Sequence, residues 1–139
     1  MRKVLIVNTD NEFISNLSDL VEWGRYDCRL IGSCNDGHQA METILRQLPD
    51  IVFIQLSIPG LSGLKVISKV LENGLLTKFV ITEEYGDFLL AQQAMRMGVQ
   101  EYLVYPINVS DIDRILSRDS DEALPINRSE ERRVGKECR

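Results

Sequence analysis

The chain is poor in the residue types that build metal, redox and disulfide sites. Its 139 residues include one histidine, His38, and three cysteines, none in the short spacing of a zinc or redox motif. No apolar run approaches the roughly 18 residues of a membrane span. Met1-Arg2-Lys3 leads into structure without the apolar segment of a signal peptide. We therefore expect a cytoplasmic protein without a cofactor.

The last residues, 128–139, differ in character from the rest of the chain. The string "RSEERRVGKECR" is similar to the in-frame translation of a short-read sequencing adapter. Without it the net charge falls from −5 to −7, because five basic and three acidic residues leave with it. We interpret the string as foreign to the protein and expect it to make no packed contacts. The alternative is a genuine basic tail that binds nucleic acid or an acidic partner.

Short apolar runs alternate with segments of helical periodicity from residue 3 to residue 117. The expected strands cover residues 3–8, 27–34, 50–55, 78–82 and 101–105. The expected helices cover residues 11–24, 36–48, 63–74, 86–98 and 108–116, the last with Asn108 or Ser110 as N-cap. This alternation predicts an α/β domain with a doubly wound, five-stranded parallel sheet of flavodoxin-like order 2-1-3-4-5 and five helices.

Two of the three cysteines lie outside the adapter-like string of residues 128–139. Cys28 and Cys34 lie on one expected strand with even spacing, which places both thiols on one face as buried, inert groups.

The sequence also indicates a domain boundary. Residues 1–117 form the expected domain. Residues 118–127 are polar and are interpreted as a linker toward a C-terminal domain that this chain lacks.

Three segments together resemble a response-regulator receiver domain. "VLIVNTDNEF" is similar to the family's first strand and loop, and "PDIVFIQLSIPGLSGL" to its phosphoacceptor segment. "YGDFLLAQQAMRMGVQEYLVYPI" is similar to the end of the domain, most of all in receivers joined to AraC-type helix-turn-helix domains. The resemblance implies a two-component signalling protein that takes a phosphoryl group from a histidine kinase.

At the positions that carry the chemistry, the chain departs from the family. Gln55 stands at the phosphoacceptor aspartate, and Asn8 and Thr9 replace the acidic pair that holds Mg²⁺, which leaves only Asp10. Glu83 replaces the Ser/Thr that binds the phosphoryl group, and Tyr105 replaces the lysine. A neutral amide cannot form an acyl phosphate. We therefore expect no catalytic residue, no metal and no enzyme activity.

The same positions predict a geometry. Asn8, Thr9, Gln55 and Glu83 should meet at the carboxyl edge of the sheet, with Tyr105 beside them. The Gln55 amide or the Tyr105 hydroxyl should donate a hydrogen bond to Glu83 and hold one conformation. The alternatives are that Gln55 is merely a satisfied polar residue, that Glu83 is solvated, and that Asp10 either binds a cation weakly or belongs to a hydrogen-bonded loop.

Other parts of a receiver are retained. Tyr102 matches the aromatic residue that switches rotamer in the family, although core packing explains it equally. Pro106 is a candidate for a cis peptide after Tyr105. The resemblance implies that residues 85–117 dimerise or bind a protein partner. The charged and polar residues expected on that surface are Asp87, Gln92, Arg96, Asp111, Asp113 and Arg114.

Three functions follow from these observations. The first is a pseudo-receiver that acts without phosphorylation and controls a missing DNA-binding domain by dimerisation or docking. The second is a phosphoacceptor that uses a substitute residue, Ser57 or Thr82. The third is a small-ligand sensor that uses the vacated pocket between Gln55, Glu83 and Tyr105. We expect DNA contact only through the missing domain, because residues 1–127 show no basic stripe.

Overall fold

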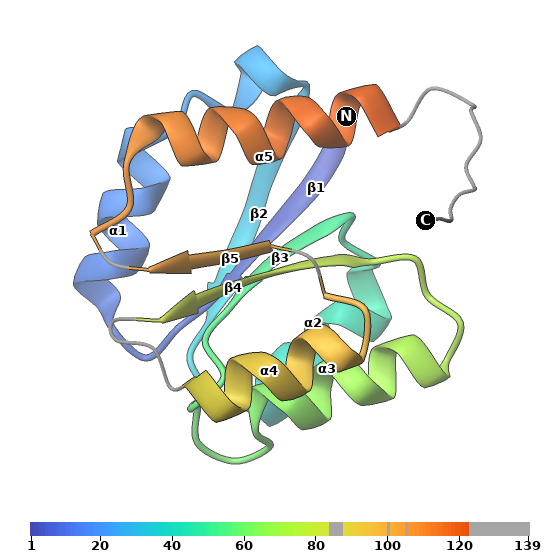
Figure 1. Cartoon of the computed structure of the whole chain (residues 1–139). Helices are drawn as coiled ribbons and strands as arrows, with labels where there is room; N and C mark the ends of the chain where they lie inside the picture. The colour runs from blue at the N-terminus through green and yellow to red at the C-terminus, as the bar shows by residue number, and fades with distance from the viewer. Residues whose placement is uncertain (84–87, 100, 105, 123–139) are drawn as a thin grey trace.

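The computed structural model describes residues 1–83, 88–99, 101–104 and 106–122, in which strands and helices alternate (Figure 1). The strands are β1 (Arg2–Val7), β2 (Cys28–Cys34), β3 (Ile51–Ile54), β4 (Lys78–Glu83) and β5 (Glu101–Val104). The α-helices are α1 (Asn11–Leu20), α2 (Gly37–Gln47), α3 (Gly63–Glu72), α4 (Phe88–Arg96) and α5 (Val109–Glu122). No helix in these ranges is long and apolar enough to cross a membrane.

The strands form one parallel sheet of order β2-β1-β3-β4-β5, which confirms the predicted flavodoxin-like topology. Helices α1 and α5 cover one face, and α2, α3 and α4 cover the other (Figure 1). Residues 4–7 of β1 and 51–54 of β3 are at most 1% exposed. Such continuous apolar strands are typical of a parallel sheet that is covered on both faces.

Helix α1 is shorter than the predicted helix of residues 11–24. It ends at Leu20 because Val21 takes an extended backbone (φ −97°, ψ 129°) and turns its side chain into the core. Leu20, the last residue of the helix, is 43% exposed. A 3₁₀ helix, Trp23–Tyr26, follows, and the Trp23 ring packs edge-on against Phe53 with 6.2 Å between ring centroids.

The prediction that Cys28 and Cys34 share one face is wrong. The pairing of β1 with β2 shifts by one residue, because Val4 pairs with Leu30 whereas Leu5 pairs with Gly32. The extra residue, a β-bulge, reverses the alternation of side chains. Cys28 therefore packs on the side of α1 and α5, and Cys34 on the side of α2. Both are buried free thiols, and burial raises the pKa of Cys34, which agrees with an inert role.

Helix α5 is longer than predicted. It starts after Asn108, whose side chain accepts a hydrogen bond from the Asp111 backbone N–H (2.9 Å), and it continues to Glu122. The first part of the expected linker, residues 118–122, is therefore helical, because the polar sequence carries no proline or glycine to stop the helix. Residues 123–127 and the adapter-like residues 128–139 lie outside the described ranges.

The loop between β3 and α3 is anchored against the start of α2. The Gly37 backbone N–H donates to the Pro59 carbonyl (2.9 Å). A side-chain Cβ at Gly37 would overlap the backbone carbonyl of Leu61, so only glycine fits this approach. This contact fixes the loop that follows Gln55.

We expect Gly37→Ala to lower the free energy of unfolding by about 3 kcal/mol, because the added methyl group displaces the 59–61 loop. Urea denaturation followed by circular dichroism measures the change. Gly24→Ala is the matched control, because a Cβ at Gly24 meets nothing within 4 Å. The control should stay within about 0.5 kcal/mol of the parent. Equal stability of the two variants would contradict the proposed anchor.

Candidate functional site

The carboxyl ends of β1, β3 and β4 meet at one edge of the sheet. Val7 pairs with Ile54, and Ile54 pairs with Ile81, so the residues that follow these positions are neighbours. Asn8 follows β1, Gln55 follows β3, and Glu83 is the last residue of β4. The structure thus brings together three of the positions that the sequence placed at this edge.

Asn8 and Asp10 organise the loop after β1. Asn8 is fully buried; its backbone N–H donates to the Cys34 carbonyl (2.9 Å), and its Oδ1 accepts from the Asp10 N–H (2.9 Å). Asp10 Oδ1 accepts from the backbone N–H groups of Glu12 (3.0 Å) and Phe13 (3.3 Å) as the N-cap of α1. The carboxylate of Asp10 therefore belongs to a hydrogen-bonded loop, the second of the two alternatives for this residue.

Gln55 is oriented toward β1 by Thr9. Its Oε1 accepts from the Thr9 backbone N–H (2.9 Å) and from the Thr9 hydroxyl (3.0 Å). Its own backbone N–H donates to the Val7 carbonyl (2.9 Å) and extends the ladder between β1 and β3. The amide oxygen thus joins two strand ends that meet at this edge.

Glu83 is buried, with 6% of its surface exposed, so the alternative of a solvated side chain is wrong. Its Oε2 accepts from the Leu56 backbone N–H at 2.7 Å, the short distance of a charge-assisted hydrogen bond. A direct hydrogen bond between Gln55 and Glu83 was predicted, but none joins these two described residues. The connection instead passes through the main chain, because the carboxylate binds the residue that follows Gln55.

The remaining predicted positions are more dispersed. Tyr102 is half-buried and packs against the core on the side of α2, α3 and α4, as core packing predicts. Pro106 is exposed and lines a cavity of about 310 Å³ between α1 and the start of α5. Tyr105 lies outside the described residues, and with it the predicted hydroxyl contact to Glu83 and the candidate cis peptide.

The cavity beside the site is formed by other residues than those of the predicted ligand pocket. Its lining consists of Asp10, Glu12, Phe13, Asn16, Leu17, Leu20, Pro106 and Ile107. Neither Gln55 nor Glu83 contributes to it. No group of three or more histidine, cysteine or acidic side chains in the described ranges could hold a metal ion.

Two features of the structure were missed from the sequence. The first is the Leu56 N–H as the partner of Glu83, which no side-chain pattern reveals. The second is Glu101, which is 3% exposed and joins the Arg114 guanidinium (3.0 Å) and the Lys78 ammonium (3.9 Å). An acidic residue inside an apolar strand was the available signal, because a buried carboxylate requires a cation or a donor.

The fold and this edge define the chain as an α/β signalling domain of the receiver type. The family model for the response regulator receiver domain matches residues 4–117, and the chain belongs to this family. It is the receiver domain of a two-component response regulator.

Known relatives and solved structures agree with this assignment. The chain is 31% identical over 121 residues to the uncharacterized transcriptional regulatory protein YesN of Bacillus subtilis, covering 84% of this chain and 33% of YesN. It is 25% identical over 118 residues to the transcriptional regulatory protein HptR of Staphylococcus aureus, covering 85% and 46% of the two chains. The chain thus spans less than half the length of either relative.

Among solved structures, the fold matches the REC domain of AraT, a response regulator from Geobacillus stearothermophilus. The TM-score is 0.80 at 24% identity, over 88% of this chain and 95% of that one. The receiver domain of NarL from Mycobacterium tuberculosis matches with a TM-score of 0.76 at 19% identity, over 86% and 96%. These similarities establish the fold.

We expect Glu83→Ala to lower the free energy of unfolding by about 2 kcal/mol, because the buried Leu56 N–H loses its acceptor. Glu83→Gln keeps an oxygen acceptor without the charge and should cost about 1 kcal/mol. Chemical denaturation measures both variants. Glu42→Ala, at an exposed position of α2, is the control and should have little effect. A neutral result for Glu83→Ala would show that the hydrogen bond does not stabilise the domain.

Proposed function

We propose that this receiver domain regulates without being phosphorylated and controls a DNA-binding domain that follows it in the complete protein. The relatives YesN and HptR are transcriptional regulatory proteins, and this chain matches only part of their length. The observation that carries the proposal is the composition of the carboxyl edge. An amide stands where the family has its nucleophile, and a buried carboxylate stands beside it.

Gln55 is unsuited to phosphoryl transfer. Its amide nitrogen is not nucleophilic, and its oxygen already accepts two hydrogen bonds from Thr9. Asn8 and Thr9 supply neutral groups where Mg²⁺ coordination in the family relies on carboxylates. Catalysis of phosphoryl transfer depends on positioning and on charge stabilisation. The loss of both the nucleophile and the carboxylates that bind Mg²⁺ therefore removes the reaction.

Glu83 adds electrostatic repulsion. Its buried carboxylate bonds the backbone directly after Gln55, close to where a phosphoryl group would be attached. Two like unit charges about 4 Å apart repel by about 4 kcal/mol at an effective dielectric constant of roughly 20. In its ionised form the carboxylate opposes an incoming phosphoryl group at this edge. This supports a domain that holds one conformation.

The other two functions receive less support. Thr82, a candidate substitute acceptor, is completely buried, so a phosphodonor cannot reach its hydroxyl without local opening. Ser57 is exposed but lies beyond the strand end, in the loop toward Pro59. A ligand sensor would require a cavity lined by Gln55 and Glu83, whereas the cavity beside this edge is lined by α1 and residues 106–107.

Incubation with Mg²⁺ and acetyl phosphate should therefore add no acid-labile phosphate to the chain. Intact-protein mass spectrometry measures the addition, and a receiver with the acceptor aspartate verifies the donor. Gln55→Asp alone should remain unmodified, because the metal ligands and the lysine are still absent. An acyl phosphate on the parent chain, or a stable beryllofluoride adduct, would refute the proposal.

The face formed by α4, β5 and α5 supports a dimer. It carries the exposed apolar residues Leu89 (71%) of α4 and Val104 (47%) of β5. Of the charged residues expected there, Arg114 donates to Glu101 of β5, whereas Asp113 accepts from the Tyr26 hydroxyl (2.9 Å) and therefore lies toward the 3₁₀ helix. An apolar centre with a mixed-charge rim is typical of an interface between identical subunits.

We expect the chain to form a dimer whose dissociation constant is unchanged by acetyl phosphate. The double variant Leu89→Asp/Val104→Asp should be monomeric, because it places buried charges on both sides of a symmetric interface. Light scattering coupled to size-exclusion chromatography measures the mass. Leu45→Asp, at an exposed position of α2, is the control and should remain dimeric. A parent chain that stays monomeric at all concentrations would contradict this mode of regulation.

A further inference from the structure

Four residues at the amino edge of the sheet, opposite the candidate site, have contacts that converge on one turn of α5. Arg2, Lys78 and Glu101 are the first residues of β1, β4 and β5, and Tyr26 lies two residues before β2. The strands are parallel, so their first residues share one edge. The turn of α5 that these residues reach, directly or through one another, consists of residues 113–116.

Arg2 joins an inner strand of the sheet to the helix. Its Nη2 donates to the Leu116 carbonyl of α5 (3.1 Å) and to the Tyr26 carbonyl (2.7 Å). One guanidinium therefore connects β1, α5 and the 3₁₀ helix that precedes β2, where the start of β1 lies beside α5 (Figure 1). Arginine suits this position, because its planar group presents several donors in fixed directions.

Two further hydrogen bonds tie the same turn of α5 toward the outer strands, β2 and β5. On the β2 side, the Tyr26 hydroxyl donates to Asp113 (2.9 Å). On the β5 side, the Arg114 guanidinium donates to Glu101 (3.0 Å), whose carboxylate is buried. Because β2 and β5 stand at opposite ends of the strand order, the helix is held on both flanks.

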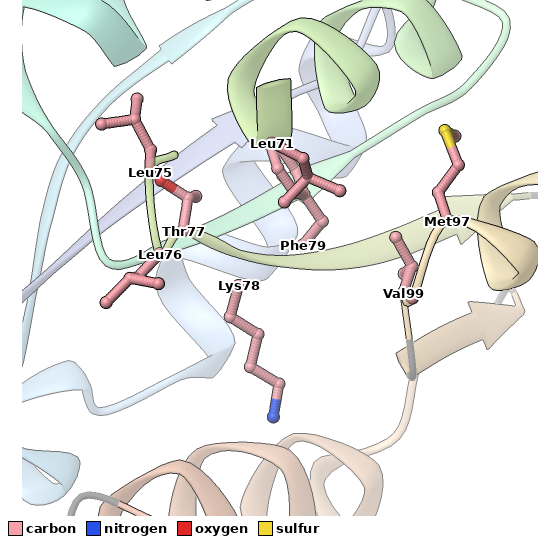
Figure 2. A pocket seen from close by; sticks show the side chains of 9 residues that line it. Leu71, Leu75, Leu76, Thr77, Lys78, Phe79, Met97 and Val99 are labelled. Atoms are coloured by element: carbon pink, nitrogen blue, oxygen red, sulfur yellow. The ribbon is translucent and has the colours of Figure 1, made fainter. Parts of the chain in front are cut away.

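Lys78 strengthens the tie on the β5 side. Figure 2 shows its side chain extending from β4 toward α5, away from Leu71 and Leu75, which line a groove of about 330 Å³. Its ammonium group lies 3.9 Å from the Glu101 carboxylate. Two cations, one from β4 and one from α5, thus share one buried carboxylate, and a charge in that environment requires such partners.

The polar contacts supply what the apolar packing of α5 lacks. Ile112, Ile115 and Leu116 are at most 1% exposed and hold the helix against the sheet. Apolar contacts are non-directional, so they leave rotation of the helix and its position along the axis weakly defined. Hydrogen bonds have defined distances and angles. Bonds on both flanks and to a carbonyl of the helix therefore fix its rotation and its axial position.

We propose that the amino edge of the sheet sets the position of α5, with Arg2 and Tyr26 as positioning residues. The inference rests on the proposed function, in which the chain continues from α5 to a DNA-binding domain. The contacts lie at the edge opposite Gln55 and Glu83, so the position of α5 does not depend on the chemistry of the carboxyl edge. The receiver thereby presents the start of its output connection in one fixed orientation.

Residual dipolar couplings of the backbone amides in the full chain test the proposal. In the parent, α5 and the sheet should fit one common alignment, because the helix is fixed on the sheet. In the double variant Arg2→Gln/Tyr26→Phe, the couplings of residues 113–122 should fall by about a third relative to those of β1 and β3, because the helix then moves. Arg29→Gln, at an exposed position of β2, is the control and should match the parent.

The outcomes separate positioning from stabilisation. If α5 of the double variant still fits the alignment of the sheet, the proposal is overturned even when the urea midpoint falls, because the two residues then only stabilise the domain. Couplings of α5 that depart from the common alignment in the parent would also overturn it. Phosphorylation of the parent chain would refute the proposed function alone, because these couplings do not depend on it.

Discussion

The pairing of β1, β3 and β4 is the constraint on which the site depends. The three strands are parallel and aligned, so whatever residue ends each of them lies beside the others. Burial of the strands on both faces leaves no freedom to shift the register without exposing apolar side chains. The edge therefore persists whether it carries a nucleophile or an amide. This separates the stability of the fold from its chemistry, and it allows Gln55 and Glu83 to occupy the edge without loss of the domain.

The fold was largely predictable because the periodicity of apolar residues indicates which face of each strand or helix is buried. Apolar strands alternating with amphipathic segments were sufficient for the sheet order, and handedness excluded most other connections. Local irregularities were not predictable. The bulge at Ile31 that separates Cys28 from Cys34 depends on pairing with β1, which no pattern within β2 encodes. Similarly, the end of α1 depends on the packing of Val21 rather than on helix propensity.

The site was predictable in position but not in its contacts. Parallel topology was enough to bring Asn8, Gln55 and Glu83 together, because strand ends share an edge. The partner of Glu83 was missed because it is a backbone N–H, and every residue except proline supplies one. Thr9 was expected at the site, but its role as the double donor to Gln55 depends on a side-chain orientation that sequence does not specify.

Under the proposed function without phosphorylation, the two edges of the sheet have different roles. At the carboxyl edge, the hydrogen bonds of Gln55 and Glu83 fix the strand ends without a bound ion. At the opposite edge, Glu101 ties β4, β5 and α5 together through Lys78 and Arg114. β4 carries both Glu83 and Lys78, so one rigid strand joins the two edges. The proposed function assigns control of such a domain to what binds its faces, and we propose a second copy on α4, β5 and α5 as that partner.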